Sequence, residues 1–175
     1  ATSTSTTLRL ASAGSLGGSQ PLPGDGSGVL IDDVRVVATN SLSTFTENGT
    51  AVAIATANSL AFDGNGATLN SATITLTNAQ TGDQLLVNGL TTATGTLTGG
   101  IAYTISGNTV TLTGAGTETN YAAAIRAISF SNTTENPNTT QRVINVTVSD
   151  GAQTSNTAVA RINVVAVNDT PTITA

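Results

Sequence analysis

Short runs of alternating apolar and polar residues constrain the fold of this chain more than any other feature. In these runs the apolar positions are mostly Val, Ile and Leu, and the residues between them are largely Thr and Asn. Period-two alternation is typical of strands that bury one face, because successive side chains point to opposite faces of a sheet. The pattern predicts strands at 34–37, 51–54, 72–76, 84–87, 101–105, 109–112, 142–148 and 157–165.

Turn residues separate these runs, and one segment has a different period. Ser106-Gly107-Asn108 and Asp150-Gly151 each predict a hairpin. In residues 119–127 the apolar positions have helical spacing, and Thr117 or Thr119 is suited to cap the start. We expect a short helix there that crosses from one sheet to the other. The predicted fold class is all-β, a Greek-key β-sandwich of the cadherin or immunoglobulin type with a short helical crossover.

The first 30 residues differ in composition from the rest of the chain. They are rich in Ser, Thr, Gly and Pro, and they end in a series of structure breakers at 21–28. Two interpretations stay open, a flexible linker and an extended arm that pairs with another subunit. We therefore divide the chain into an N-terminal arm or linker (1–30), a β-sandwich domain (31–166) and a C-terminal linker or start of a next strand (167–175).

The composition excludes several kinds of chemistry. The chain has no His, Cys, Met or Trp, and all five of its basic residues are arginines. Ser-His-Asp catalysis, thiol chemistry, ordinary zinc sites and Schiff bases are therefore excluded. Ten acidic residues against five arginines make a nucleic-acid interface implausible. No stretch approaches the roughly 18 apolar residues of a membrane span, so we expect no transmembrane segment. We expect no catalytic residues and no enzymatic activity.

Several motifs follow one another in order between residues 40 and 175. They are Phe45-Thr46-Glu47-Asn48-Gly49, Asp63-Gly64-Asn65, the segment 121–132, Val148-Ser149-Asp150-Gly151 and Val167-Asn168-Asp169-Thr170-Pro171. In order and spacing they resemble the bacterial cadherin-like, proteoglycan-type repeats of large surface adhesins and extracellular matrix proteins. This resemblance implies a sandwich joined head to tail with its neighbours, outside the cell.

The resemblance also implies calcium at the junctions between successive repeats. Calcium takes six to eight oxygen ligands, which carboxylates from two domains and a linker supply together. Carried over by position, Glu47, Asn168 and Asp169 face the C-terminal junction, and Asp63, Asn65 and Asp150 face the N-terminal one. For Asp150 and Asp169 the alternative interpretation is a side chain that caps a turn.

The predicted function is an extracellular structural or adhesive module, either a surface-adhesin repeat or a self-assembling filament subunit of a matrix. Its partners are copies of itself or neighbouring repeats. Leu8, Arg9 and Leu10 alternate like a strand, and we expect them to add a strand to the sheet edge of the next copy. The alternative function is a module that binds carbohydrate or protein through loops at one end of the sandwich, which requires a concave site.

Overall fold

A computed structural model of the chain describes residues 34–37, 41–56, 60–63 and 68–169, all within the unit formed by residues 31–175. The proposed arm residues Leu8, Arg9 and Leu10 lie outside the described residues, as does Asn65. The described part is mostly β, which confirms the all-β prediction and is consistent with a sandwich.

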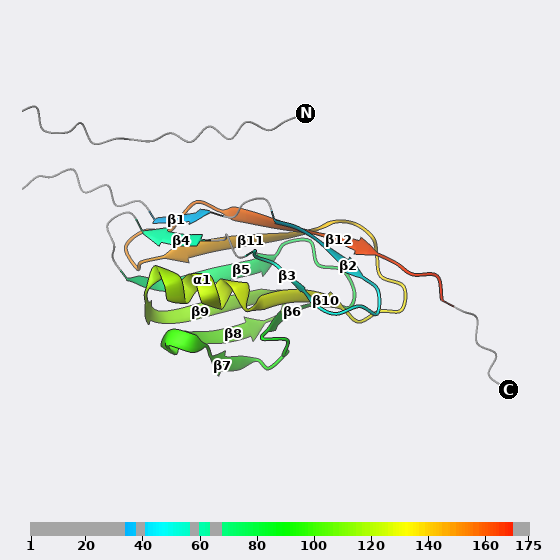
Figure 1. Cartoon of the computed structure of the whole chain (residues 1–175), viewed down its shortest axis with the longest axis horizontal. Helices are drawn as coiled ribbons and strands as arrows, with labels where there is room; N and C mark the ends of the chain where they lie inside the picture. The colour runs from blue at the N-terminus through cyan, green and yellow to red at the C-terminus, as the bar shows by residue number, and fades with distance from the viewer. Residues whose placement is uncertain (1–33, 38–40, 57–59, 64–67, 170–175) are drawn as a thin grey trace, which may run out of the picture. The chain divides into compact units, whose positions relative to one another are not determined.

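Most strands belong to one large sheet, in the order β2-β12-β11-β5-β9-β8-β7. Figure 1 shows β11, β5, β9, β8 and β7 following one another down the view. Within this sheet β2 pairs parallel with β12, and all other pairs are antiparallel. The strand bounds are β2 Ser41–Thr46, β5 Leu69–Leu76, β7 Thr94–Thr96, β8 Ala102–Ser106, β9 Thr109–Gly116, β11 Arg142–Ser149 and β12 Ala158–Val165.

Two smaller sheets complete the fold. The small sheet has the order β3-β10-β6, with β3 at Val52–Ala53, β6 at Asp83–Val87 and β10 at Ile128–Asn132. A separate antiparallel pair is formed by β1, Val34–Val37, and β4, Leu60–Asp63.

The hydrophobic core contains side chains from both the large and the small sheet. Phe45 of β2 and Phe130 of β10 meet edge to face, with ring centroids 5.6 Å apart and an interplanar angle of 88°. Along β11, every second residue from Arg142 to Val148 is buried and the residues between are half-buried. The predicted alternation therefore holds, and it places the apolar half of each long strand inside.

The outward face of the large sheet is rich in threonine. The register places Thr147, Thr73, Thr111, Thr104 and Thr94 opposite one another on five neighbouring strands. In a parallel row on the same face, the hydroxyls of Thr75 and Thr109 lie 3.3 Å apart. β-branched Thr suits a half-exposed pleated surface, so the abundant Thr is used where the alternation predicted it.

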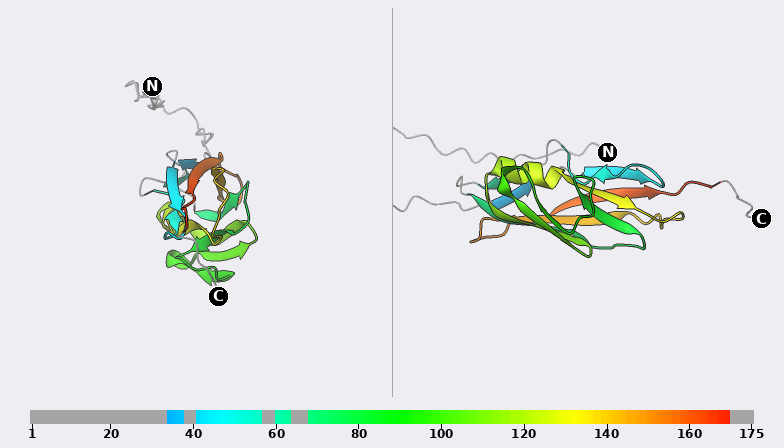
Figure 2. Two further views of the ribbon diagram at one scale, coloured as in Figure 1. Left: turned by 90° about the vertical axis from the view of Figure 1, so that its right-hand side faces the viewer. Right: turned by 90° about the horizontal axis from the view of Figure 1, so that it is seen from below.

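One α-helix, α1 at Glu118–Arg126, connects β9 of the large sheet to β10 of the small sheet, as predicted. It lies on one face of the large sheet (Figure 2). The Thr117 hydroxyl accepts a hydrogen bond from the backbone N–H of Asn120 at 3.2 Å, so Thr117 is the N-cap. Tyr121, Ala124 and Ile125 are buried, which is the spacing that predicted the helix.

The eight predicted strands are present, β1 with its predicted bounds and the other seven with shifted ends, but the alternation did not predict β2, β4, β7 or β10. β7 has the sequence Thr-Gly-Thr, which carries no apolar signal. The hairpin at Ser106-Gly107-Asn108 joins β8 to β9 as expected. The Asp150-Gly151 turn does join two antiparallel neighbours, but residues 150–157 form a longer connection than a tight hairpin.

Candidate metal centre

Three acidic residues meet at the end of the domain where β2, β10 and β12 finish (Figure 1). β2 and β12 are parallel, so their C-terminal ends lie side by side. Glu47 follows β2 directly, Glu135 lies in the loop 133–141 after β10, and Asp169 follows β12. One carboxylate oxygen from each residue lies within 4.8 Å of the other two. The topology therefore brings together residues that are far apart in the sequence.

Glu47 is the buried member of this acidic cluster, with 4% of its surface exposed. Its Oε2 accepts a hydrogen bond from the backbone N–H of Val167 at 2.7 Å, and its own N–H donates to the Val165 carbonyl at 2.9 Å. Its Oε1 has no hydrogen-bond partner among the described residues. A buried carboxylate oxygen without a donor is costly, and a bound cation at this position would offset that cost.

The cluster concentrates negative charge. Two unit charges about 4 Å apart repel each other by roughly 1 kcal/mol in water, and by about 4 kcal/mol under the screening typical of a protein surface. Glu135 and Asp169 are exposed, which limits this repulsion, whereas Glu47 is not. A bound cation would convert the mutual repulsion of the three carboxylates into attraction.

The donor set fits calcium. Oxygens bound to one Ca²⁺ at about 2.4 Å cannot be more than about 4.8 Å apart, and the three carboxylate oxygens meet this condition. Glu135 and Asp169 can each bind through one oxygen or two, which leaves further positions for water or for oxygens from a neighbouring domain. All donors are hard oxygen ligands, which suits calcium and magnesium rather than zinc or copper.

The structure brings Glu47 and Asp169 together, as their assignment to one junction predicts. Asn168 is exposed and precedes Asp169 in the chain. Sequence reasoning missed Glu135. It is the sole carboxylate of the loop 133–141, and no recognised motif contains it. Its only signal in the sequence is an acidic residue after a strand, which is too common to be informative.

Of the second predicted group, Asp150 is the member whose side chain lies in the described part of the chain. Asp63 is the last residue of β4, where its backbone pairs with Val34, and Asn65 lies outside the described residues. The Asp150 carboxylate accepts hydrogen bonds from the backbone N–H groups of Gln153 at 2.7 Å and Ala152 at 2.8 Å, and these bonds lower its pKa. The turn-capping interpretation accounts for these contacts, and ligation at this end stays a prediction.

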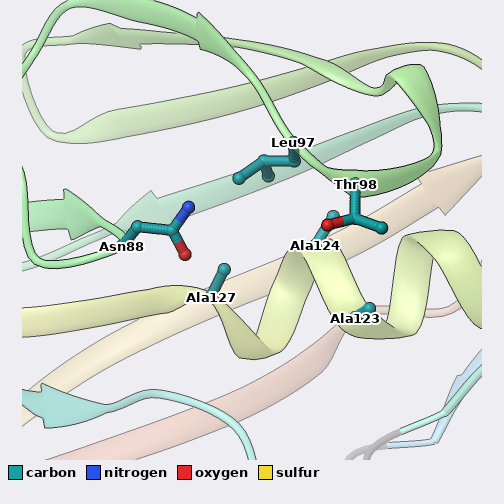
Figure 3. A pocket seen from close by; sticks show the side chains of 6 residues that line it. All are labelled: Asn88, Leu97, Thr98, Ala123, Ala124 and Ala127. Atoms are coloured by element: carbon teal, nitrogen blue, oxygen red, sulfur yellow. The ribbon is translucent and has the colours of Figure 1, made fainter.

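A pocket lies between α1 and the segments around β7 (Figure 3). No charged or aromatic side chain lines it. Its polar side chains are Asn88 and Thr98, and the aromatic groups by which a carbohydrate site is recognised are absent from its lining. Its lining residues are Asn88, Leu97, Thr98, Ala123, Ala124 and Ala127.

Comparison of the chain with protein-family models, curated proteins and solved structures gave no match. Within the described part of the chain, no helix combines the length and the apolar character needed to cross a membrane.

Proposed function

We propose that this chain is an extracellular structural or adhesive module that works in a head-to-tail array and binds calcium at its C-terminal end. The observation that carries the proposal is the acidic cluster of Glu47, Glu135 and Asp169, in which the buried Glu47 has an oxygen without a donor. The cluster lies where the chain leaves β12. A cation bound there would hold in place the segment 166–169, by which the chain leaves β12.

Glu47 provides the link between the ion and the connection. One oxygen of its carboxylate already binds the N–H of Val167, two residues before Asp169, and the other is free to bind an ion. A calcium ion shared by Glu47 and Asp169 therefore anchors residues 167–169 to the end of β2. The ion would stiffen the exit of the chain more than it stabilises the core.

A cadherin-like Greek-key arrangement is the finer fold that we propose. It is supported by the crossover through α1 between the two sheets, and by the parallel pairing of β2, at the edge of the large sheet, with the last strand β12. The absence of His, Cys and Lys from the sequence supports a role without catalysis. No described feature favours the alternative of a carbohydrate- or protein-binding module.

Calcium titration of the full chain by isothermal calorimetry tests the metal site. We expect one site with a dissociation constant of about 10⁻⁴ to 10⁻³ M, as in other extracellular modules. Glu47→Gln retains the acceptor for the Val167 N–H but removes the charge, so it should abolish the heat of binding. Glu118→Gln on α1 is the matched control and should titrate like the parent chain. Equal titration by both variants would show that the cluster is not the site.

Assembly through the arm is a separate part of the proposal. The outer strands of the large sheet are β2 and β7, and β-augmentation at such an edge needs an incoming strand with free backbone N–H groups. We expect the full chain to form polymers that light scattering detects, and the double substitution Leu8→Pro and Leu10→Pro, which removes two donors, should abolish them. Prolines at Ser15 and Gly17 serve as the control. Unchanged polymerisation of the Leu8/Leu10 variant would exclude donor-strand pairing by this segment.

A further inference from the structure

A buried ion pair connects the two sheets. Arg142 is the first residue of β11 in the large sheet, and Asp83 is the first residue of β6 in the small sheet. The Arg142 Nε donates to Asp83 Oδ2 at 2.6 Å and its Nη2 donates to Oδ1 at 3.2 Å, a two-pronged contact. Both side chains are fully buried.

The remaining donors of Arg142 are directed at the loop that carries Glu135. Its Nη2 donates to the Asn138 carbonyl at 2.8 Å, and its Nη1 donates to the Thr140 carbonyl. Arg142 therefore anchors the loop 133–141 on the C-terminal side of Glu135. A lysine could not make the same set of contacts, because its ammonium group has no planar fork.

Asn132 anchors the same loop on the N-terminal side of Glu135. Its Nδ2 donates to Asp83 Oδ1 at 2.8 Å, so it belongs to the same buried network. Its Oδ1 accepts from the backbone N–H of Thr134 at 2.8 Å and from the Thr134 hydroxyl at 2.6 Å. Thr134 is the residue directly before Glu135. The network thus holds the loop on both sides of this one carboxylate.

We infer that Arg142, Asp83 and Asn132 are positioning residues that hold Glu135 in place for a divalent cation. This inference rests on the proposed calcium site. A buried ion pair seldom adds net stability compared with apolar residues of the same size. The contacts of Arg142 with the loop 133–141 therefore explain the presence of the pair better than a gain in stability does. When such a support fixes a ligand beforehand, binding does not have to order the loop, and the affinity for the ion is higher.

The test uses the paired substitution Asp83→Asn with Arg142→Met in the full chain. It removes both charges together and so avoids a buried unpaired charge. Circular dichroism first establishes that the variant is folded. In calcium titrations we expect its affinity to fall about tenfold or more, the range found when residues that orient metal ligands are replaced. Leu112→Ala, in the core in the middle of β9, is the control for general destabilisation and should titrate normally.

A double-mutant cycle shows whether the network acts through Glu135. Glu135→Ala alone should weaken calcium binding, and the paired substitution should then cause little further loss, since the ligand it positions is gone. Additive losses, or unchanged affinity of the paired variant, would overturn the inference. If the parent chain does not bind calcium at millimolar concentration, the metal site of the proposed function is itself wrong, which is a distinct result.

Discussion

Two polar clusters involve the same loop, and they differ in whether their charges are balanced. In the network of Arg142, Asp83 and Asn132, opposite charges face each other and both carboxylate oxygens of Asp83 accept hydrogen bonds. In the cluster of Glu47, Glu135 and Asp169 all charges have the same sign, and a buried oxygen has no donor among the described residues. The first cluster is complete within the chain. The second brings three carboxylates together without a counter-charge among the described residues.

From this difference we expect the balanced network to contribute mainly to the stability of the fold and the acidic cluster mainly to ion binding. Removing Asp83 or Arg142 from the balanced network leaves the other buried charge alone, so it should destabilise the fold with or without calcium. Removing one member of the acidic cluster relieves repulsion, so it should change mainly the response to calcium. The first two of the following predictions test this contrast directly, and the other two extend it to polar groups outside both clusters.

The largest expected effect is that of Asp83→Ala. The substitution leaves the fully buried Arg142 guanidinium without its counter-charge, and we expect the free energy of unfolding to fall by about 3–5 kcal/mol. Urea denaturation with and without calcium measures the loss, which should be similar in both. If the variant does not fold at all, Asp83→Asn with Arg142→Met should restore folding. A loss below about 1 kcal/mol would contradict the conclusion that Asp83 is the essential counter-charge of the buried Arg142.

The next effect concerns Glu47→Gln. At calcium ten times above the dissociation constant, binding stabilises the parent chain by about 1.4 kcal/mol, which raises the melting temperature by about 3–6 °C. The variant should lose this rise and, in chelator, should be at least as stable as the parent because one repulsive charge is gone. Thermal melts monitored by circular dichroism measure both. A calcium-induced rise that persists in Glu47→Gln would place the ion elsewhere.

The Tyr121 hydroxyl is a buried polar group that has a hydrogen-bond partner and carries no charge at neutral pH. Its hydroxyl donates to the Gly114 carbonyl at 2.7 Å, and burial raises its pKa to about 12. In the unfolded chain the Tyr121 phenol ionises near pH 10, whereas in the folded chain it stays protonated until about pH 12. The contribution of Tyr121 to the free energy of unfolding is therefore retained below pH 10 and is lost as the pH rises toward 12. Tyr121→Phe should cost about 1 kcal/mol at pH 7 and should reduce this alkaline loss. An unchanged alkaline profile in urea melts would contradict the assignment to Tyr121.

The smallest effect is expected at Asp150, an exposed carboxylate that already has donors. Backbone hydrogen bonds lower its pKa, so its stabilising contribution is present above the pKa of the unfolded chain and is lost as the pH falls through the folded value. The stability difference between the parent and Asp150→Ala should therefore shrink in acid. Calcium affinity should not change in this variant. A clear loss of calcium binding would instead support ligation at the N-terminal junction.

Local pattern was sufficient for much of the fold. Period-two alternation identified the long strands β5, β9, β11 and β12, because a strand that buries one face must alternate whatever its partners are. The capping Thr117 and the spacing of Tyr121, Ala124 and Ile125 likewise identified α1 within one residue of its observed start. The alternation did not predict short edge strands such as β7, since Thr-Gly-Thr becomes a strand only by pairing with β8.

The candidate metal centre could be predicted only in part from local sequence, and the rest depends on the tertiary structure. Glu47 and Asp169 belong to motifs by which the sequence resembles a known family, and that resemblance assigned both residues to one junction. Glu135 belongs to none, and Arg142 and Asp83 are 59 residues apart, with nothing in either local sequence to indicate a pair. Those contacts arise when β6, β10 and β11 pack against one another. A residue's strand pattern is set by its neighbours in the chain, whereas its charge partners are set by which strand ends the topology brings together.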